Sequence, residues 1–328
     1  MPTTNETEHT LRASSPLGPL MALMGFGIYA THDVVVKYLG ASYSVFQIMF
    51  FSGLLSFPLI IVMVMRDRTP GTLNAVHPWW SLLRMLTVVS GTAAAFYAFT
   101  VLPLAQTYTM LFAAPILITV LSIPILGEKV GLHRWLAVTL GLLGVVVVLR
   151  PGTVPISLGH VAGIMAAFGI ALSSVIMRKI GREERSAVLM LYPMLANVII
   201  MGAALPFVYQ PMAFADLALT GVISVMAFTA SLLIIGAYRR AEAAIVAPMQ
   251  YSQILWAAFY GALLFSEAPD GWTWVGAGLI IASGLYIVFR ETQRNVSANR
   301  PVLRTRSRLE TVPQTGLGAT PDFATDGG

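Results

Sequence analysis

Ten long apolar stretches, spread over most of the chain, constrain its fold more than any other feature of the sequence. They cover residues 17–39, 43–65, 79–100, 104–126, 131–149, 158–177, 187–208, 216–238, 243–265 and 271–289. About 20 apolar residues in a helix cross the hydrocarbon core of a bilayer, so each stretch is long enough to span a membrane. Lipid offers the backbone no hydrogen-bond partners, and the alternating pattern of a membrane β-barrel is absent. We therefore predict an all-α integral membrane protein with ten transmembrane helices.

The composition supports this prediction and excludes several other classes of protein. Apolar residues make up 56% of the 328 positions and charged residues only 11%, a balance that a soluble core does not need. The chain contains no cysteine, so we expect neither a disulfide framework nor a thiolate metal site. We expect no metal and no cofactor. We attribute the net charge of +5 to membrane topology and lipid contact rather than to nucleic-acid binding.

The distribution of basic residues predicts the orientation in the membrane. With the N-terminus in the cytoplasm, Lys37 and Arg150 fall on the outer face. The inner face then carries the arginines of the C-terminal tail together with Arg66, Arg68, Lys129, Arg134, Arg178, Lys179, Arg182, Arg185, Arg239 and Arg240. Because Lys and Arg are enriched in cytoplasmic loops, both termini are predicted to be cytoplasmic, in the cell inner membrane. The polar segment 1–16 lacks the features of a cleaved signal, and the tail 291–328 is expected to be disordered.

The two halves of the membrane region resemble each other. Sliding the chain along itself by about half the membrane region aligns Ala98 with Ala237, Ala105 with Ala244, Met110 with Met249, Glu128 with Glu267, Trp135 with Trp274 and Leu140 with Leu279. A slightly longer shift superposes YATHDVVVKYLG on IALSSVIMRKIG and pairs Lys37 with Arg178. The copies, 17–150 and 158–290, hold five helices each, so the second copy should enter the membrane from the opposite side. Inverted repeats of this kind provide two similar packings that can exchange, which is the basis of alternating access in secondary transporters.

Two segments resemble the EamA repeats of the drug/metabolite transporter superfamily: YAFTVLPLAQTYTMLFAAPILITVLSIPILGEKVGLHRWLAVTLGLLGVVVVL and AAIVAPMQYSQILWAAFYGALLFSEAPDGWTWVGAGLIIASGLYIV. The spacing from Pro115 to Gly127 and Glu128 fits the family pattern, whereas the second copy has Ser266 before Glu267 and no proline opposite Pro115. The resemblance implies ten helices, a central cavity lined by both repeats, and transport of amino acids, nucleosides, cofactors or similar metabolites. The stretch APMQYSQILW is similar to family members that take up riboflavin or S-adenosylmethionine, so these two lead the candidate substrates.

Ionisable side chains inside the hydrocarbon region are costly and are therefore candidates for function. Asp33, Lys37 and Arg84 lie clearly inside predicted spans. Asp33 and Lys37 share one helix face, where they can form an ion pair, or Lys37 can extend outward to the interface. Asp33 is the only acid well inside a span, so proton coupling through a carboxylate would use it, and the neighbouring His32 is either a helix-facing polar residue or a second proton site. Arg84 either extends to the cytoplasmic interface or binds a carboxylate or phosphate of the substrate.

Uncharged polar side chains at mid-depth indicate where a substrate would bind, because a buried amide needs a partner, a water or a ligand. Asn197 lies near the middle of the seventh span, and Gln250 and Gln253 lie near the middle of the ninth. Tyr251 and Trp256 flank these glutamines and offer rings that can stack on a planar substrate. Hydrogen bonding between helices is the alternative role for each amide, and for Asn197 above all.

Polar residues near the ends of the spans have weaker claims to a functional role. Tyr97, Gln106 and Tyr108 cluster near the outer ends of the third and fourth spans, where they either face the cavity or belong to the interfacial aromatic belt. Glu128 and Glu267 are equivalent in the two repeats. Because both stand at span ends, we interpret them as residues that close the turns into the fifth and tenth helices.

Two other classes of function are open on the sequence alone, a membrane-embedded enzyme and a non-transporting receptor or assembly factor. The chain has no H-E-x-x-H or G-x-S-x-G motif, no thiol and no P-loop. Short predicted loops leave little surface for a protein partner. We therefore predict a secondary transporter, not an enzyme, whose partners are a small-molecule substrate and the lipid bilayer, and which is a monomer or a homodimer.

Overall fold

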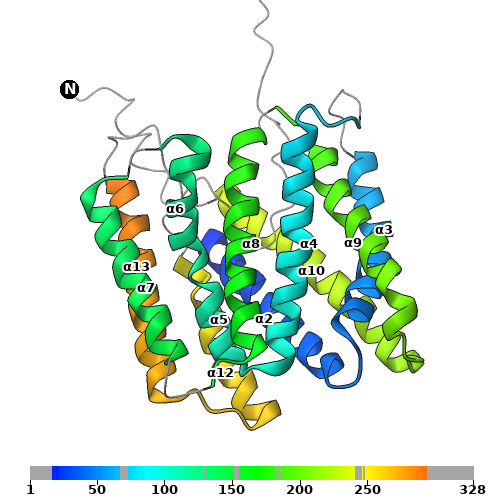
Figure 1. Cartoon of the computed structure of the whole chain (residues 1–328). Helices are drawn as coiled ribbons and strands as arrows, with labels where there is room; N and C mark the ends of the chain where they lie inside the picture. The colour runs from blue at the N-terminus through cyan, green and yellow to red at the C-terminus, as the bar shows by residue number, and fades with distance from the viewer. Residues whose placement is uncertain are drawn as a thin grey trace, which may run out of the picture.

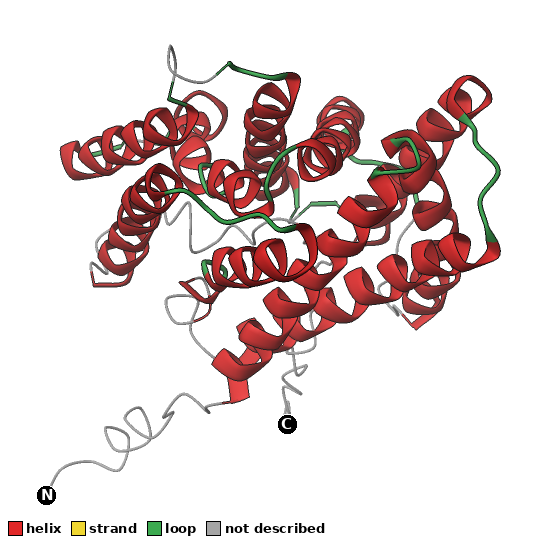
Figure 2. Ribbon diagram, turned by 90° about the horizontal axis from the view of Figure 1, so that it is seen from below, coloured by secondary structure: helices red, strands yellow, loops and turns green. Residues whose placement is uncertain are grey.

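A computed structural model of the chain describes residues 17–66, 73–128, 130–150, 155–181, 183–184, 186–240, 246 and 248–293. Helices and short connections account for all of this part of the chain, and Figure 2 shows no strand in it. The predicted N-terminal segment 1–16 and nearly all of the tail 291–328 lie outside the described residues. The last helix continues to Gln293, past the predicted end of the second repeat.

The helices follow one another in two sets that correspond to the two predicted repeats. The first set is α2 (Leu17–Gly40), α3 (Val45–Arg66), α4 (Pro78–Val101), α5 (Leu104–Leu111), α6 (Ala114–Leu126) and α7 (Leu132–Leu149). The second set is α8 (Leu158–Ile180), α9 (Ser186–Val208), α10 (Phe214–Arg240), α12 (Ser252–Phe265) and α13 (Gly271–Gln293). Within the described residues, seven spans are long and apolar enough to cross a membrane, and three shorter apolar helices bring the total to the ten predicted.

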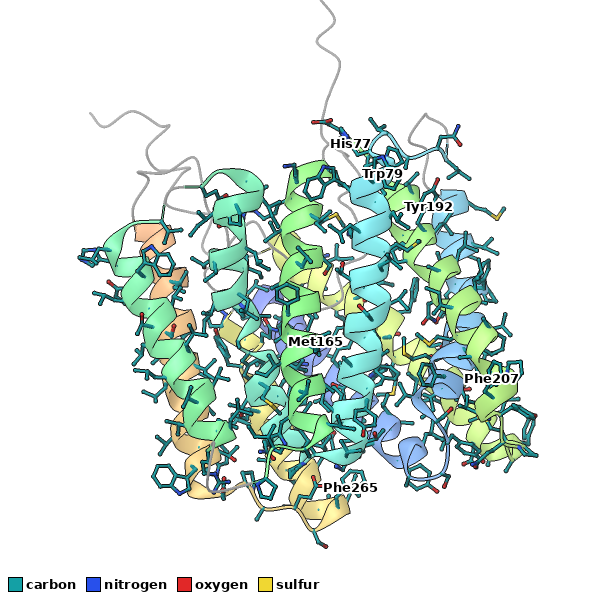
Figure 3. The ribbon with its side chains drawn as sticks, viewed as in Figure 1. His77, Trp79, Met165, Tyr192, Phe207 and Phe265 are labelled. Atoms are coloured by element: carbon teal, nitrogen blue, oxygen red, sulfur yellow. The ribbon has the colours of Figure 1, made fainter. Side chains whose placement is uncertain are left out.

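The outer surface of the bundle is apolar, as expected of a protein solvated by lipid. Large apolar side chains such as Phe207, Phe214 and Leu158 are more than two-thirds exposed. Met165, at mid-height on α8, is also more than half exposed, and in Figure 3 it lies on the outer side of the bundle. A soluble protein of this size would bury such residues. The chain is therefore an all-α integral membrane protein.

Packing between the helices relates the two repeats by an approximate two-fold axis. Helix α2 of the first repeat packs along α10 of the second, and the equivalent pair, α8 of the second repeat with α4 of the first, packs in the same way. Two further extensive contacts join α3 to α9 and α7 to α13, and in both of these each helix meets its own counterpart in the other repeat (Figure 1). A Cβ added to Gly169 would lie 2.8 Å from the Cα of Gly91, so α4 and α8 approach closely where both residues lack a side chain. The architecture consists of two inverted five-helix repeats.

The fourth and ninth spans are each interrupted at equivalent positions. Between α5 and α6, the amide of Ala113 donates to the carbonyl of Met110. In the ninth span, the amides of Tyr251 and Gln253 bond in the same i to i−3 pattern, to Pro248 and Gln250. The two interruptions coincide in the sequence alignment of the repeats. A short 3₁₀-type turn within a span is a common place for a hinge.

Each interrupted span ends in a left-handed residue followed by a glutamate. Gly127 has φ 70° and precedes Glu128, and its counterpart Ser266 has φ 55° and precedes Glu267. The amide of each glutamate bonds back to a carbonyl of the preceding helix, 3.4 Å away for Glu128 and 2.9 Å for Glu267. These backbone bonds close the helix ends as the sequence predicted.

Replacing Gly127 with alanine should destabilise the protein through backbone strain alone. A Cβ at this position meets nothing within 4 Å, and a left-handed residue with a side chain costs about 1–2 kcal/mol. Gly278→Ala is the matched control, because Gly278 lies inside α13 without a left-handed φ and also has open space around it. Thermal unfolding of the purified proteins in detergent should show a lower midpoint for Gly127→Ala only. Equal unfolding midpoints for the two variants would show that the left-handed backbone at position 127 does not strain an alanine.

Candidate functional site

The two interrupted spans meet in the interior of the bundle, where α5 packs against α12. Phe112 and Tyr251, which are equivalent in the two repeats, place their ring centroids 5.1 Å apart with an interplanar angle of 82°. Phe112 belongs to the largest core cluster, and Tyr251 packs against the same cluster. The two helix breaks are therefore covered by protein, where non-helical backbone is tolerated at membrane depth. We call this region the helix crossing.

Gln253 lies directly beside the helix crossing in the first turn of α12. Its side chain is completely buried, and neither its amide nitrogen nor its amide oxygen hydrogen-bonds to a described residue. A primary amide without partners in an apolar interior costs free energy, so it marks a place where another polar group is expected. Gln250 is half-buried on the preceding turn, in agreement with a polar stripe along this face.

Aromatic side chains extend the same region along α12 towards α2. Trp256 is 39% exposed and stacks on Tyr260, with ring centroids 6.3 Å apart. The indole of Trp256 faces Gly27 of α2, and the hydroxyl of Tyr260 lies 2.9 Å from the hydroxyl of Thr31. The face of α12 that carries Trp256 and Tyr260 is therefore turned towards α2.

Asp33 forms a buried polar cluster on α2. Its carboxylate accepts a short hydrogen bond from the hydroxyl of Tyr108 on α5 and lies 2.9 Å from Nδ1 of His32. Asp33 is 1% exposed, His32 4% and Tyr108 1%. Tyr108 is thus an interior residue and not part of the aromatic belt, and His32 contacts the carboxylate rather than only facing another helix. Tyr108 also contacts Phe112 at a centroid distance of 6.0 Å, which joins the cluster to the helix crossing.

Lys37 takes neither of the two arrangements that the sequence suggested. Its ammonium group lies 2.8 Å from the carboxylate of Glu267 in the other repeat. The same group donates to the carbonyl of Leu102 at 2.6 Å and to that of Phe99 at 3.3 Å. Lys37 is 8% exposed and does not extend to a lipid interface. A partner in the other repeat therefore neutralises its charge.

Two further candidates lie away from the helix crossing. Arg84 contacts α9, and Asn197 contacts α3. Arg84 is 4% exposed and donates to the carbonyl of Leu189 at 2.7 Å, so it does not extend to the interface. Asn197 donates to the carbonyl of Met49 on α3 at 3.0 Å, which is the interhelical role that the sequence left open. The structure does not bring either residue to Gln253.

Tyr97 and Gln106 also lie apart from Gln253. Tyr97 is 37% exposed on α4. Gln106 on α5 places its amide nitrogen 3.1 Å from Nε2 of His160 at the start of α8. Both residues occupy the end of the bundle where the sequence placed them, and Gln106 connects the two repeats there.

Comparison with known proteins identifies the family. The model of the EamA-like transporter family matches the chain twice, over residues 16–150 and 157–289. The chain belongs to the EamA-like transporter family. Two matches in one chain agree with the two repeats seen in the packing of the helices, and the family description names this EamA-like protein's family as one of transporters.

Several relatives of this EamA-like protein have named substrates. The S-adenosylmethionine uptake transporter of Rickettsia felis is 26% identical over 263 residues, which are 80% of this chain and 89% of the relative. The riboflavin transporter of Rhizobium johnstonii is 28% identical over 219 residues, covering 66% of this chain and 72% of the relative. The pseudopaline exporter of Pseudomonas aeruginosa is 23% identical over 271 residues, covering 81% and 94%.

A solved crystal structure has the same fold. It superposes with a TM-score of 0.56 and 16% sequence identity, covering 86% of this chain and 98% of the other. At this identity the likeness concerns the fold alone.

Proposed function

We propose that this protein is a secondary transporter that carries S-adenosylmethionine across the inner membrane by alternating access, with both termini in the cytoplasm. Four relatives at 25–26% identity, each matched over 79–80% of this chain, are S-adenosylmethionine uptake transporters. Riboflavin is the second candidate, because relatives at 28% identity that match 66% of the chain are riboflavin transporters. Both molecules carry a planar heteroaromatic ring system.

The observation that carries the proposal is the unpartnered amide of Gln253 beside the helix crossing. A glutamine amide offers a donor and an acceptor side by side, and this arrangement can pair with the N6 and N7 positions of adenine. The nearby rings of Trp256 and Tyr260 supply aromatic surface for the same ring system. Substrate bound at this depth would satisfy an amide that no described residue satisfies, and it would lie where interrupted helices commonly form transporter sites.

Coupling to protons would use the cluster of Asp33, His32 and Tyr108. Among the described residues, Asp33 is the acid buried deepest within a span, and its two neighbours can share hydrogen bonds with either protonation state. A carboxylate held in this way can accept and release a proton without remaining unsatisfied in a medium of low dielectric constant. The ring of Tyr108 contacts the ring of Phe112, so the cluster around Asp33 is in direct contact with the helix crossing.

Uptake into vesicles that contain the purified protein tests the substrate and the site together. S-adenosylmethionine should exchange across the membrane, and Gln253→Ala should weaken apparent affinity several-fold, since one lost hydrogen bond to a ligand costs about 0.5–1.5 kcal/mol. Gln210→Ala is the control, because that side chain is exposed in the loop between α9 and α10. Riboflavin and a set of amino acids belong in the same assay. If another compound exchanges and S-adenosylmethionine does not, the proposed substrate is wrong. If Gln253→Ala has the same apparent affinity as the parent, the proposed binding site is wrong.

Asp33→Asn tests the coupling group. The amide cannot bind and release a proton, so a pH gradient should no longer drive accumulation, whereas exchange of labelled for unlabelled substrate should continue. Glu183→Gln is the control, because Glu183 is an acid exposed to solvent between α8 and α9. An Asp33→Asn protein that accumulates substrate as the parent does would remove this carboxylate from the coupling mechanism.

A further inference from the structure

Two ion pairs between the repeats occupy equivalent positions, one at each end of the bundle. Lys37 on α2 pairs with Glu267, which follows α12, at 2.8 Å. Arg178 on α8 pairs with Glu128, which follows α6. We call them the far ion pair and the near ion pair, where the near end of the bundle is the one at which α2 begins. The structure forms both pairs at once.

The two ion pairs are equivalent under the repeat. When the sequences of the two repeats are aligned, Lys37 pairs with Arg178 and Glu128 pairs with Glu267. In each pair the base comes from the last turn of the first helix of one repeat, and the acid comes from the end of the interrupted span of the other. The two repeats therefore make the same contact with each other twice, in reciprocal directions.

Inversion of the repeats places the pairs at opposite ends. Phe265, whose ring lies 5.3 Å from the ammonium of Lys37, is at the end of the bundle opposite to Trp79 and His77 in Figure 3. Lys179, the neighbour of Arg178, lies 4.4 Å from the ring of Trp80, beside Trp79 at the near end. Both pairs are largely removed from solvent, with side chains 8% and 23% exposed at the far end and 9% and 2% at the near end.

Each pair holds an interrupted span to a helix of the other repeat. Glu267 also accepts the amide of Leu104 at 3.2 Å, so its carboxylate binds the start of α5 as well as Lys37. At the near end, Lys179 donates to the carbonyl of Ile125 at 2.9 Å, which adds a second bond between α8 and the end of α6. Movement of α12 or α6 at its hinge would separate the charges at one end and leave the other end in place.

We propose that the two ion pairs are the contacts that close the transport pathway at its two ends, and that each opens in turn while the other stays formed. The proposal rests on the alternating-access function proposed above. Equal contacts at both ends keep the two open states close in free energy, as an exchange between them requires. Opening an end admits water, which solvates the separated charges there, whereas separation without water would leave bare charges in the interior. Lys37, Arg178, Glu128 and Glu267 are thus positioning residues that control access and do not contact substrate.

Distances between spin labels at each end test the proposal without any substrate. The chain has no cysteine, so introduced cysteines carry the only labels. Ser42→Cys with Ala268→Cys reports on the far end, and Glu183→Cys with Gly131→Cys reports on the near end, since all four positions are exposed. Glu267→Gln should lengthen and broaden the far-end distance and leave the near-end distance unchanged. Glu128→Gln should do the reverse.

A matched control comes from a third ion pair between the repeats. Arg150 and Asp270 also meet at the far end, but their side chains are 27% and 40% exposed and they join α7 to α13, which pack along each other. Asp270→Asn should change neither distance. If Glu267→Gln does not fold, Lys37→Gln removes the same attraction and should lengthen the same distance. Lys37→Arg keeps a charged donor for Glu267 and for the carbonyls of Leu102 and Phe99, so it should leave that distance as in the parent.

The outcomes separate this proposal from the proposed function. Distances equal to those of the parent in both glutamine variants would overturn the role of the ion pairs, even in a protein that transports. A far-end change that also appears in Asp270→Asn would overturn it as well, since any loss of charge would then have the same effect. Side-specific changes that appear in Lys37→Gln and not in Lys37→Arg support the proposal, and they do so whichever compound the vesicle assay identifies as substrate.

Discussion

A bilayer provides no hydrogen-bond partners for a peptide backbone, and the rest of this structure depends on that constraint. It makes every span helical and permits an interruption only where protein covers the exposed backbone groups. The chain interrupts two spans, and it places the two interruptions against each other at the contact of Phe112 with Tyr251. Each break thereby covers the other. The interrupted backbone of these two spans thus lies in the interior of the bundle, beside the unpartnered amide of Gln253.

Inversion of the repeat turns each local feature into a pair of features at two ends of the molecule. A left-handed residue followed by a glutamate ends the fourth span at the near end, and another such pair of residues ends the ninth span at the far end. Each glutamate then meets a base from the other repeat. A contact that closes one end therefore exists at the other end too, and a motion that favours opening at one end has an equivalent at the other. The account of alternating access proposed for this protein depends on this duplication.

Much of the fold could be predicted from the sequence, because the membrane imposes signals that are local and strong. The ten spans follow from runs of apolar residues, and the repeat follows from matches such as Glu128 with Glu267. The partner of Lys37 could not be predicted in this way, since Asp33 is a neighbour in sequence and Glu267 lies in the other repeat. The sequence also left open whether Tyr108 lies in the interior or in the aromatic belt, because its depth depends on where α5 ends and on its bond to Asp33. The repeat did contain one unused signal, since the alignment that pairs Glu128 with Glu267 also pairs Phe112 with Tyr251.

The central claim is that the helix crossing faces each side of the membrane in turn. A single cysteine in place of Gln250, which is half-buried beside Tyr251, tests it in an otherwise cysteine-free chain. In sealed vesicles, a thiol reagent that cannot cross the membrane should react with this cysteine when added on either side. S-adenosylmethionine should slow both reactions. Reaction from one side only, whatever the substrate concentration, would contradict alternating access at this site.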